Sequence, residues 1–431
     1  MSKSIEDIAK DLKAANKKVQ LIYAFNGTGK TRLSCAFKDL IAPKSADDDE
    51  NELSRNKILY YNAFTEDLFY WDNDLEAVTE PEPKLKIQPN SFTDWLITLL
   101  KDLGEDGNIV TNFQRYNSGK VTPEFNEEYK YKDKDHSGKL IEVTVPAYSE
   151  IVFKVAAKPK EINAVALDNE HAVVEGQYER IKISKGEESN FVWSVMYTLL
   201  EQVVSTLNER DPANRMTDKF NQLEYVFIDD PVSSLDDSHL IELAVDLAKL
   251  IKNSAYTKGN GLKFIVTTHS PLFYNVLHNE LNNDLKNPNP NGIPVWLYKR
   301  DQSKKYRLNK KADETFELEL SNDRPFSYHL FLLDELRKSI NDQQIKKYHF
   351  NFLRNILEKT ATFLGYKHWE DLLEKTDGGN PDPFANRILN LSSHSAHAGE
   401  EISDIEEKDK EKLIELVKFL TLKYGFLDEK K

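Results

Sequence analysis

The feature of this sequence that most restricts its fold is a short apolar segment ending in a loop with two glycines and a lysine. Residues 19–25 read VQLIYAF, residues 26–31 read NGTGKT, and a helical pattern follows at residues 33–40. From Ala24 to Thr31 the chain matches the phosphate-binding pattern G-x-x-x-x-G-K-[ST], except that Ala24 replaces the first glycine. The order strand, loop, helix predicts a loop whose backbone wraps phosphate groups.

Each residue type in this loop suits the binding of a nucleotide. Glycines let backbone N–H groups surround the phosphates, Lys30 can reach the β and γ oxygens, and the Thr31 hydroxyl can ligate magnesium. An ordinary glycine-rich turn before a helix is the alternative interpretation, and the strand and helix on either side favour the first one. The expected nucleotide-binding residues here are Asn26, Gly27, Thr28, Gly29, Lys30, Thr31 and Arg32.

A second phosphate-chemistry element lies at the end of another apolar segment, residues 225–230 (YVFIDD). Asp229 can hold the magnesium ion through water, and Asp230 stands where an acid that activates water would be placed. A helix follows this segment, and residues 262–269 (LKFIVTTH) predict a third strand. Strands that alternate with helices indicate a mainly parallel sheet, to which residues 295–300 are expected to add one more strand.

Composition limits the remaining possibilities. The chain has 431 residues, of which 39% are hydrophobic and 30% charged, and its net charge is −14. These values exclude wholesale disorder and oppose nonspecific coating of nucleic acid or of an anionic membrane. With one cysteine, no zinc-like spacing, and no apolar signal core or membrane-length segment, we expect a cytoplasmic protein that does not bind membranes.

The pattern along the chain predicts two domains. Residues 1–300 are expected to form the α/β nucleotide-binding domain, with a strand-rich insertion at about residues 117–182. From about residue 326 the pattern becomes helical, so residues 301–431 are expected to form an all-α domain.

Further segments resemble the motifs of ATP-binding-cassette ATPases. Residues 225–237 (YVFIDDPVSSLDD) resemble the Walker B strand with the D-loop, His269 resembles the switch histidine, and residues 184–188 (SKGEE) are similar to the signature motif. In that family the signature of one subunit closes over nucleotide bound to the other, so the resemblance implies dimerisation. It adds to the expected nucleotide-binding residues Ser184, Gly186, Glu187, Asp229, Asp230 and His269. Asp230 replaces the usual longer glutamate, which predicts slow hydrolysis.

Two groups of residues stand out in the C-terminal helices. Arg354 and Glu358 lie four apart on one helix face, which by itself is most simply an ordinary ion pair worth about 0.2–0.5 kcal/mol. Arg387 and His394 are separated by six residues. This R-x6-H spacing resembles the motif of the HEPN superfamily of metal-independent ribonucleases.

The whole chain resembles the PrrC-type anticodon nucleases, in which an ATP-binding-cassette-like domain is fused to a domain that cuts tRNA in the anticodon loop. The matching segments, in order, are YAFNGTGKTRLS, YYNAFTEDLFYWDND, SKGEES, VFIDDPVSSLDD, TTHSP, FSYHL, LRNILEKTATFLGY and SSHS. The resemblance implies an ABC-type P-loop ATPase domain with a strand-rich insertion, followed by an all-α nuclease domain. It places the catalytic residues at Arg354, Glu358 and His394.

These residue types suit an attack of the RNA 2′-hydroxyl on its own phosphate, which leaves 2′,3′-cyclic phosphate and 5′-hydroxyl ends. Glu358 could be the base, His394 the acid and Arg354 the cation that holds the phosphate oxygens, and the acid and base roles could be reversed. No metal is needed for this cut. Magnesium is expected only with the nucleotide, at Thr31 and Asp229.

Substrate contacts are expected at a basic segment, residues 299–311, with seven positive charges and one negative. A solvated hairpin is the alternative interpretation. The resemblance places anticodon recognition just beyond it and favours lysine tRNA. The expected substrate-binding residues are Lys304, Lys305, Arg307, Asn322, Asp323 and Arg387.

The resemblance further implies an antiphage toxin that is gated by ATP or GTP with Mg²⁺, with a thymidine nucleotide as a possible second effector. It also implies a homodimer or higher homo-oligomer, held latent by a type I restriction–modification complex. Two alternatives are a DNA-repair ATPase similar to RecF or SMC proteins, and an ATPase sensor whose helices dock a separate nuclease. Long heptad repeats between the Walker motifs are usual in the first alternative, and the sequence has none.

Overall fold

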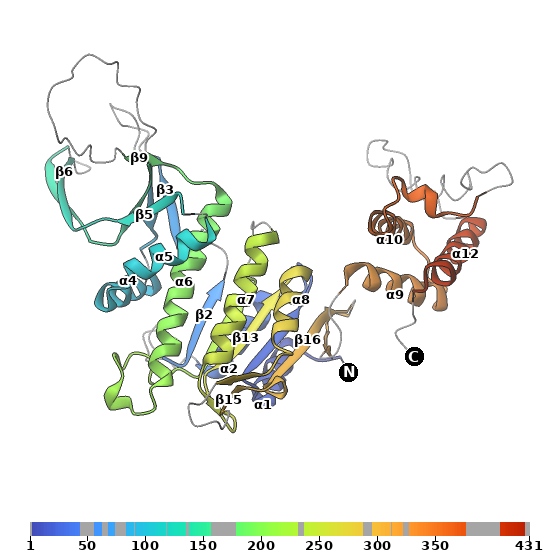
Figure 1. Ribbon diagram of the computed structural model, residues 1–431, viewed down its shortest axis with the longest axis horizontal. Helices are drawn as coiled ribbons and strands as arrows, with labels where there is room; N and C mark the ends of the chain where they lie inside the picture. Colours follow the sequence, from blue (N-terminus) through green and yellow to red (C-terminus); the bar gives the residue numbers. More distant parts are fainter. Residues whose placement is uncertain are drawn as a thin grey trace, which may run out of the picture. The chain divides into compact units, whose positions relative to one another are not determined.

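The computed structural model describes thirteen stretches of the chain, which form two compact units, Met1–Pro325 and Phe326–Lys431 (Figure 1). The described stretches are residues 2–43, 56–62, 68–73, 83–89, 91–117, 119–134, 138–156, 178–231, 237–287, 295–311, 313–321, 327–375 and 406–426. Among these residues no helix is both long enough and apolar enough to cross a membrane.

The first unit is built on a six-stranded sheet in the order β17-β16-β1-β13-β10-β2. Its strands are β1 (Val19–Tyr23), β2 (Ile58–Asn62), β10 (Tyr225–Asp229), β13 (Lys263–Thr268), β16 (Ser303–Lys310) and β17 (Phe316–Leu320). All neighbouring pairs are parallel except the hairpin of β16 with β17. The α/β class and the mainly parallel sheet predicted from the sequence are confirmed.

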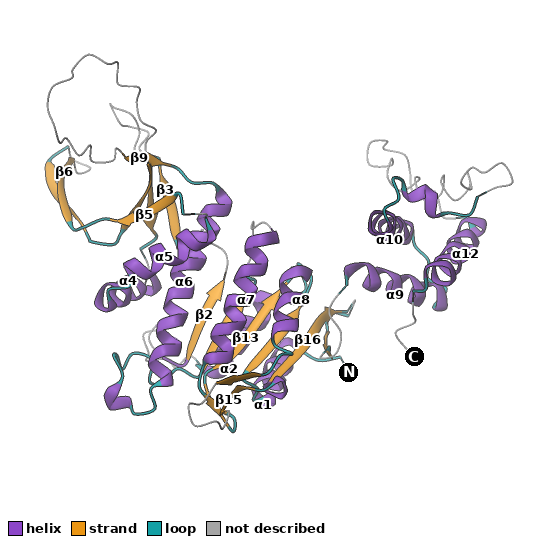
Figure 2. Ribbon diagram, in the orientation of Figure 1, coloured by secondary structure: helices purple, strands orange, loops and turns teal. Residues whose placement is uncertain are grey.

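Helices cover both faces of this sheet, which explains why its central strands are continuous apolar runs (Figure 2). Every residue of β1 and of β10 is buried. On one face α1 (Ile5–Ala15) and α2 (Lys30–Ile41) share a core with side chains of β1, β10 and β13. On the other, α8 (Pro271–Glu280) packs on β1 and β13, and α7 (Asp237–Asn253) packs on α8.

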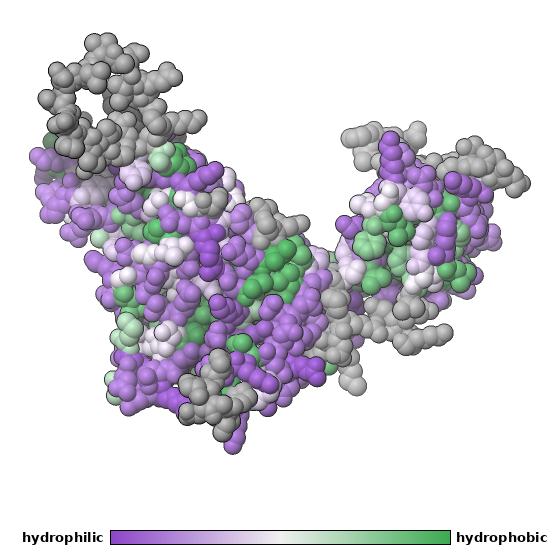
Figure 3. All heavy atoms as spheres, in the orientation of Figure 1, coloured by the Kyte–Doolittle hydropathy of each residue, from purple (hydrophilic) through white to green (hydrophobic). Residues whose placement is uncertain are grey.

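The exposed surface of the first unit is largely hydrophilic, as its high content of charged residues predicts (Figure 3). An apolar patch on the face drawn lies over α7 and α8. On α7 the side chains of Ile241 and Val245 are partly exposed.

One strand expected in the central sheet lies elsewhere. β15 (Val295–Tyr298) pairs antiparallel with β14 (Leu285–Asn287), so the prediction that residues 295–300 extend the sheet is wrong. The short helix η3 (Arg300–Gln302) turns the chain after β15, and β16 takes the place beside β1. A second small hairpin joins β11 (Tyr256–Thr257) to β12 (Asn260–Gly261).

The segment between β2 and α6 (Lys185–Asn208) forms a subdomain around a second sheet, in the order β3-β4-β8-β5 with β9 beside β8. Its strands are β3 (Phe69–Asp72), β4 (Lys84–Ile87), β5 (Val121–Phe125), β8 (Glu150–Ala156) and β9 (Tyr178–Ile181), with a hairpin of β6 (Tyr129–Lys134) and β7 (Leu140–Val145). Two helices, α4 (Ser91–Leu103) and α5 (Asp106–Tyr116), complete it. Phe153 packs against Phe191 of α6 with ring centroids 5.3 Å apart, which joins the subdomain to that helix.

The second unit contains α9 (Tyr328–Asn341), α10 (Tyr348–Leu364), the short helix η4 (Trp369–Leu372) and α12 (Glu407–Tyr424). One apolar core, which includes Leu333, Leu357 and Leu416, joins these helices. The division between the units at Pro325 differs from the boundary expected at residue 300. The physical reason is that β16 and β17 hydrogen-bond into the first unit's sheet.

Candidate functional site

The phosphate-binding loop joins the end of β1 to the start of α2, as the sequence predicts. Gly27 and Gly29 have φ angles of 77° and 95°, a region that residues with a Cβ rarely adopt. A Cβ added to Gly29 would also lie only 3.2 Å from the ring of Phe316. The backbone conformation therefore favours glycine at position 29, and a Cβ there would also be tight against the Phe316 ring.

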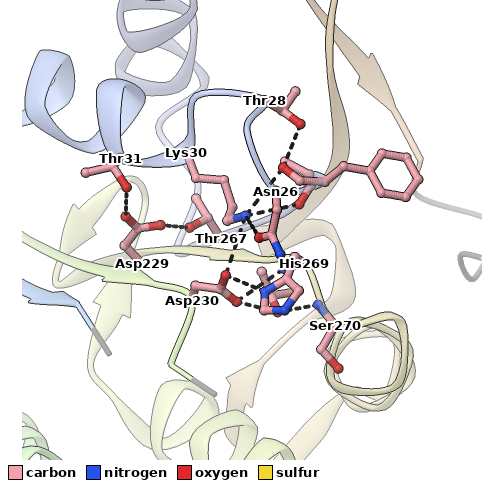
Figure 4. Close-up of polar contacts among 12 residues, drawn as sticks. Asn26, Thr28, Lys30, Thr31, Asp229, Asp230, Thr267, His269 and Ser270 are labelled. Atoms are coloured by element: carbon pink, nitrogen blue, oxygen red, sulfur yellow. Dashed lines mark hydrogen bonds and ion pairs between the residues drawn. The ribbon is translucent and has the colours of Figure 1, made fainter. Parts of the chain in front are cut away.

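Lys30 lies at the mouth of this loop with only 8% of its surface exposed (Figure 4). Its Nζ donates to Asn26 Oδ1 at 3.2 Å and to the carbonyl oxygen of Ala24 at 3.4 Å, and it lies 3.4 Å from Asp230 Oδ2. A buried ammonium group inside a loop of backbone donors is suited to phosphate oxygens. The remaining loop residues have local roles, since Thr28 Oγ1 donates to the Phe25 carbonyl and the Arg32 guanidinium lies over the Phe316 ring.

Asp229 ends β10 and is 2% exposed. Thr267 Oγ1 donates to its Oδ1 at 2.5 Å, while Thr31 Oγ1 and the Tyr60 hydroxyl donate to its Oδ2 at 3.1 Å and 3.4 Å. Burial raises the pKa of Asp229, although the hydrogen bonds from Thr267 and Thr31 act in the opposite direction. The carboxylate and the Thr31 hydroxyl thus converge as hard oxygen donors, a set that fits Mg²⁺ retaining several waters.

Asp230 follows directly, with the unusual φ of 53°. Its Oδ2 lies 2.5 Å from His269 Nδ1, and its Oδ1 accepts a hydrogen bond from the backbone N–H of His269 at 3.2 Å. Burial would raise the pKa of Asp230, but the hydrogen bonds and charges of His269 and Lys30 hold it below its ordinary value. Asp230 is therefore an ionised carboxylate that orients His269 beside the phosphate-binding loop.

The structure thus brings together Lys30, Thr31, Asp229, Asp230 and His269, which the sequence analysis had named from three separate segments (Figure 4). They lie where β1, β10 and β13 end, because the carboxyl ends of adjacent parallel strands share one edge.

The sequence analysis missed Thr267, Thr268 and Tyr60, whose hydroxyl groups donate to the two aspartates of this site. Thr267 is fully buried, and Tyr60, which also accepts from Ser34 Oγ at 3.2 Å, lies on β2. Thr267 and Thr268 end the apolar strand directly before His269. Their position at the end of a parallel strand was the available signal.

Ser184 lies at a different place, at the N-terminus of α6 beside the subdomain. Its Oγ accepts from the Glu187 N–H at 3.3 Å, and Glu187 Oε2 accepts from the Ser184 N–H at 2.8 Å, which is a capping box. Glu188 accepts from Trp71 Nε1 at 2.9 Å and from Lys185 Nζ at 2.9 Å. Gly186 lies in the first turn of α6, between Ser184 and Glu187 in the sequence. The expected D-loop, residues 233–236, lies outside the described residues.

The basic segment expected to contact tRNA is mostly a strand of the central sheet. Lys305 is 2% exposed and donates to Asn282 Oδ1 and Ser303 Oγ. Arg307 Nη2 bonds to Glu319 Oε2 at 2.6 Å, and Lys304 is half-buried. Because Lys305 is buried and Arg307 pairs with Glu319 of β17, these two residues do not form the open cationic surface expected from the sequence. Asn322 and Asp323 lie outside the described residues.

In the second unit, Arg354 Nε donates to Glu358 Oε1 at 2.8 Å on α10. The Arg354 guanidinium lies over the Trp369 ring, 5.9 Å from its centroid, while the two paired side chains are 26% and 45% exposed. The pair is therefore held in place and still accessible. Arg387 and His394 lie outside the described residues.

The sheet topology and the residues around Lys30 define the first unit as a P-loop ATPase domain, here joined to a helical unit. The family model described as "AAA domain" (AAA_13) matches residues 207–422. The Escherichia coli protein named "Anticodon nuclease" is 46% identical to this chain over 451 residues, covering 99% of this chain and 98% of that protein. The chain belongs to the anticodon nuclease family.

A solved structure, "Crystal structure of the SmcHead bound to the C-winged helix domain of ScpA", is also similar in part. The match covers 70% of this chain and 89% of that chain at 13% sequence identity, with a TM-score of 0.30.

Proposed function

We propose that this protein is a nucleotide-gated endoribonuclease that cuts tRNA in the anticodon loop. The observation that carries the proposal is the 46% identity to the protein named "Anticodon nuclease", which extends over both units of the chain. The accessible Arg354–Glu358 pair on α10 supplies a candidate cutting site. The ATPase site around Lys30 supplies a candidate for the gate.

The proposed cut uses the RNA itself as nucleophile. The 2′-oxygen forms a bond to the adjacent phosphorus while the bond from phosphorus to the 5′-oxygen breaks. One catalytic group accepts the 2′-hydroxyl proton, and another gives a proton to the leaving 5′-oxygen. Glu358 and His394 are assigned these two roles, in either order, and the products are a 2′,3′-cyclic phosphate and a 5′-hydroxyl. The bonds formed and broken and the two proton transfers are complete without a metal ion.

Arg354 is assigned to the charge that develops on the phosphate oxygens. Its Nε bonds to Glu358, and the planar guanidinium carries further N–H donors in a fixed geometry. The Trp369 ring beneath it restricts its orientation. The geometry supports Arg354 as a preorganised oxygen-binding group next to the candidate base.

The proposed gate is ATP or GTP with Mg²⁺, held by Lys30, Thr31 and Asp229. When bound, Mg²⁺ would neutralise phosphate charge between Thr31 and Asp229. Ser184 of a second copy would complete the site, which makes the active form a homodimer or higher homo-oligomer. The capping box at Ser184 supports this, because it places a helix N-terminus at the signature motif.

The family resemblance extends the proposal to lysine tRNA as substrate and to an antiphage role in the cytoplasm. It also extends it to latency within a type I restriction–modification complex and to a thymidine nucleotide effector. The remaining substrate contacts proposed from the sequence are Lys304, Asn322, Asp323 and Arg387.

Cleavage of total tRNA by the purified full-length protein, with mapping of both fragment ends, tests the proposal. Glu358→Ala should lower the cleavage rate by about 10²–10⁴, the usual contribution of a general acid or base. Glu415→Ala is the matched control, because Glu415 pairs with Lys412 on α12 at the same 2.8 Å and has no proposed role. An ordinary helix ion pair is worth only about 0.2–0.5 kcal/mol, so this control should cut normally.

Fragments with 5′-phosphate ends would show that water is the nucleophile, and the roles of Glu358 and His394 would have to be abandoned. Cuts outside the anticodon loop would overturn the substrate assignment. Loss of cutting by an activated enzyme on chelation, with nucleotide still bound, would overturn metal independence.

A further inference from the structure

The helix that carries Arg354 and Glu358 has a second accessible feature. Tyr348, Phe352, Lys359 and Phe363 follow one another at spacings of four, seven and four residues, so they lie on one stripe of α10. Phe363 is 87% exposed and Tyr348 is 47% exposed. We call these four residues the aromatic stripe.

Such exposure of a large aromatic side chain has a cost, because burying it would stabilise the fold. The buried core of this unit includes Ile356 and Ala361 of α10. Phe352 packs against that core, whereas Phe363 in the last turn of the helix is largely exposed. The fold itself therefore makes little use of the Phe363 ring. Exposed rings that gather in one patch, as in the aromatic stripe, are expected where a surface binds a partner.

The charge around the stripe selects the kind of partner. Residues 346–368 contain five basic residues and one acidic residue, a net charge of +4 in a chain whose net charge is −14. Basic residues interleaved with exposed aromatic rings are typical of surfaces that bind single-stranded nucleic acid, where bases stack on the rings and cations hold the phosphates. An apolar protein partner would not require this local excess of positive charge.

The helices α9 and α10 pack against each other. Burial, and to a smaller extent the charge of Lys359, lowers the pKa of His329 in the first turn of α9. The ring of Tyr328 lies 5.5 Å from that of His329, and Tyr328 is 38% exposed. The surface thus continues from α10 onto α9 with two more rings.

We propose that the aromatic stripe, extended by Tyr328 and His329, binds the unpaired bases of the RNA that flank the cut. The inference rests on the proposed nuclease function and adds the surface that positions its substrate. Phe363 lies about 7.5 Å further along the helix axis than Glu358 and about 140° around it. RNA that reaches both side chains must therefore curve around α10, so the base that stacks on Phe363 is a neighbour of the scissile phosphate in the loop.

The test uses the full-length protein and an RNA anticodon stem-loop with 2-aminopurine at successive loop positions. Phe363→Ala should weaken binding about 5- to 150-fold, the range for loss of one stacked base, and should abolish quenching at one loop position. Phe363→Trp should restore both. Leu422→Ala is the matched control, because Leu422 is 84% exposed on α12 of the same unit. It should bind like the parent.

Kinetics separate stacking from catalysis. Phe363→Ala should raise KM with little change in kcat, whereas Glu358→Ala should lower kcat. An abasic nucleotide at the quenched position should weaken binding to the parent by the same factor and leave Phe363→Ala unchanged. A parent protein that cuts no tRNA would refute the proposed function. A parent that cuts tRNA while Phe363→Ala binds and cuts like Leu422→Ala would refute only the role of the stripe.

Discussion

The buried hydrogen bond from Thr267 to Asp229 gives the sharpest test of how the nucleotide site is built. Thr267 is fully buried, and its Oγ1 donates to Asp229 Oδ1 at 2.5 Å. Thr267→Val keeps the shape of the side chain and removes this donor. Asp229 would then retain the donors on Oδ2, Thr31 and Tyr60.

The expected cost follows from the charge of the acceptor. A hydrogen bond to a charged group contributes about 1.5–3 kcal/mol to stability, against about 0.5–1.5 kcal/mol for a neutral pair. Since Asp229 is buried, solvent cannot replace the lost donor. We therefore expect Thr267→Val to lower the free energy of unfolding by about 1.5–3 kcal/mol at neutral pH.

The matched control is Thr198→Val. Thr198 is also fully buried, but its Oγ1 accepts from the neutral Asn112 amide at 2.9 Å. Urea titration followed by tryptophan fluorescence reports mainly on the first unit, which contains Trp71, Trp95, Trp193 and Trp296 of the five tryptophans. The control should lose about 0.5–1.5 kcal/mol.

The pH dependence of the stability lost in Thr267→Val tests whether the acceptor, Asp229, is ionised. Burial raises the pKa of Asp229 and the Thr267 hydrogen bond lowers it, so Thr267→Val should raise that pKa further. The stability difference between the parent and Thr267→Val is complete where Asp229 is ionised in both proteins. It begins to shrink as pH falls below the higher pKa of Asp229 in the variant, and it is smallest below the pKa of Asp229 in the parent. A loss no larger than that of Thr198→Val, or a loss that does not change on acidification, would refute the ionised-acceptor argument.

Two other predictions concern the same site. Lys30→Ala should weaken binding of Mg²⁺–ATP or Mg²⁺–GTP by at least about 10-fold, because it removes a charged hydrogen-bond donor to phosphate. Calorimetric titration measures this affinity, and an unchanged value would contradict the site assignment. Steady-state hydrolysis of the nucleotide should be far slower than about 10³ per second, because the shorter Asp230 replaces glutamate and is already bonded to His269. A phosphate-release assay that reaches that rate would contradict this prediction.

The sequence by itself determined the local parts of the nucleotide site. The phosphate-binding loop, with its two glycines, Lys30 and Thr31, directly follows an apolar strand. The conformation of this loop and the start of the next helix depend on residues that are close in the sequence. Asp229 and His269 could be named because each stands at or just after the end of an apolar strand. The parallel alternation of strands and helices then predicts that such ends meet at one edge.

The tertiary structure decided which polar groups pair and which charges remain open to solvent. Nothing local to Tyr60 or Thr267 shows that both donate to Asp229, because β2 and β13 are brought beside β10 only by sheet order. The basic residues of β16 illustrate the same limit. Their sequence suggests a cationic surface, but pairing of β16 with β1 and β17 buries Lys305 and places Glu319 against Arg307. Whether a charged side chain of a strand is paired depends on the side chains of the neighbouring strands.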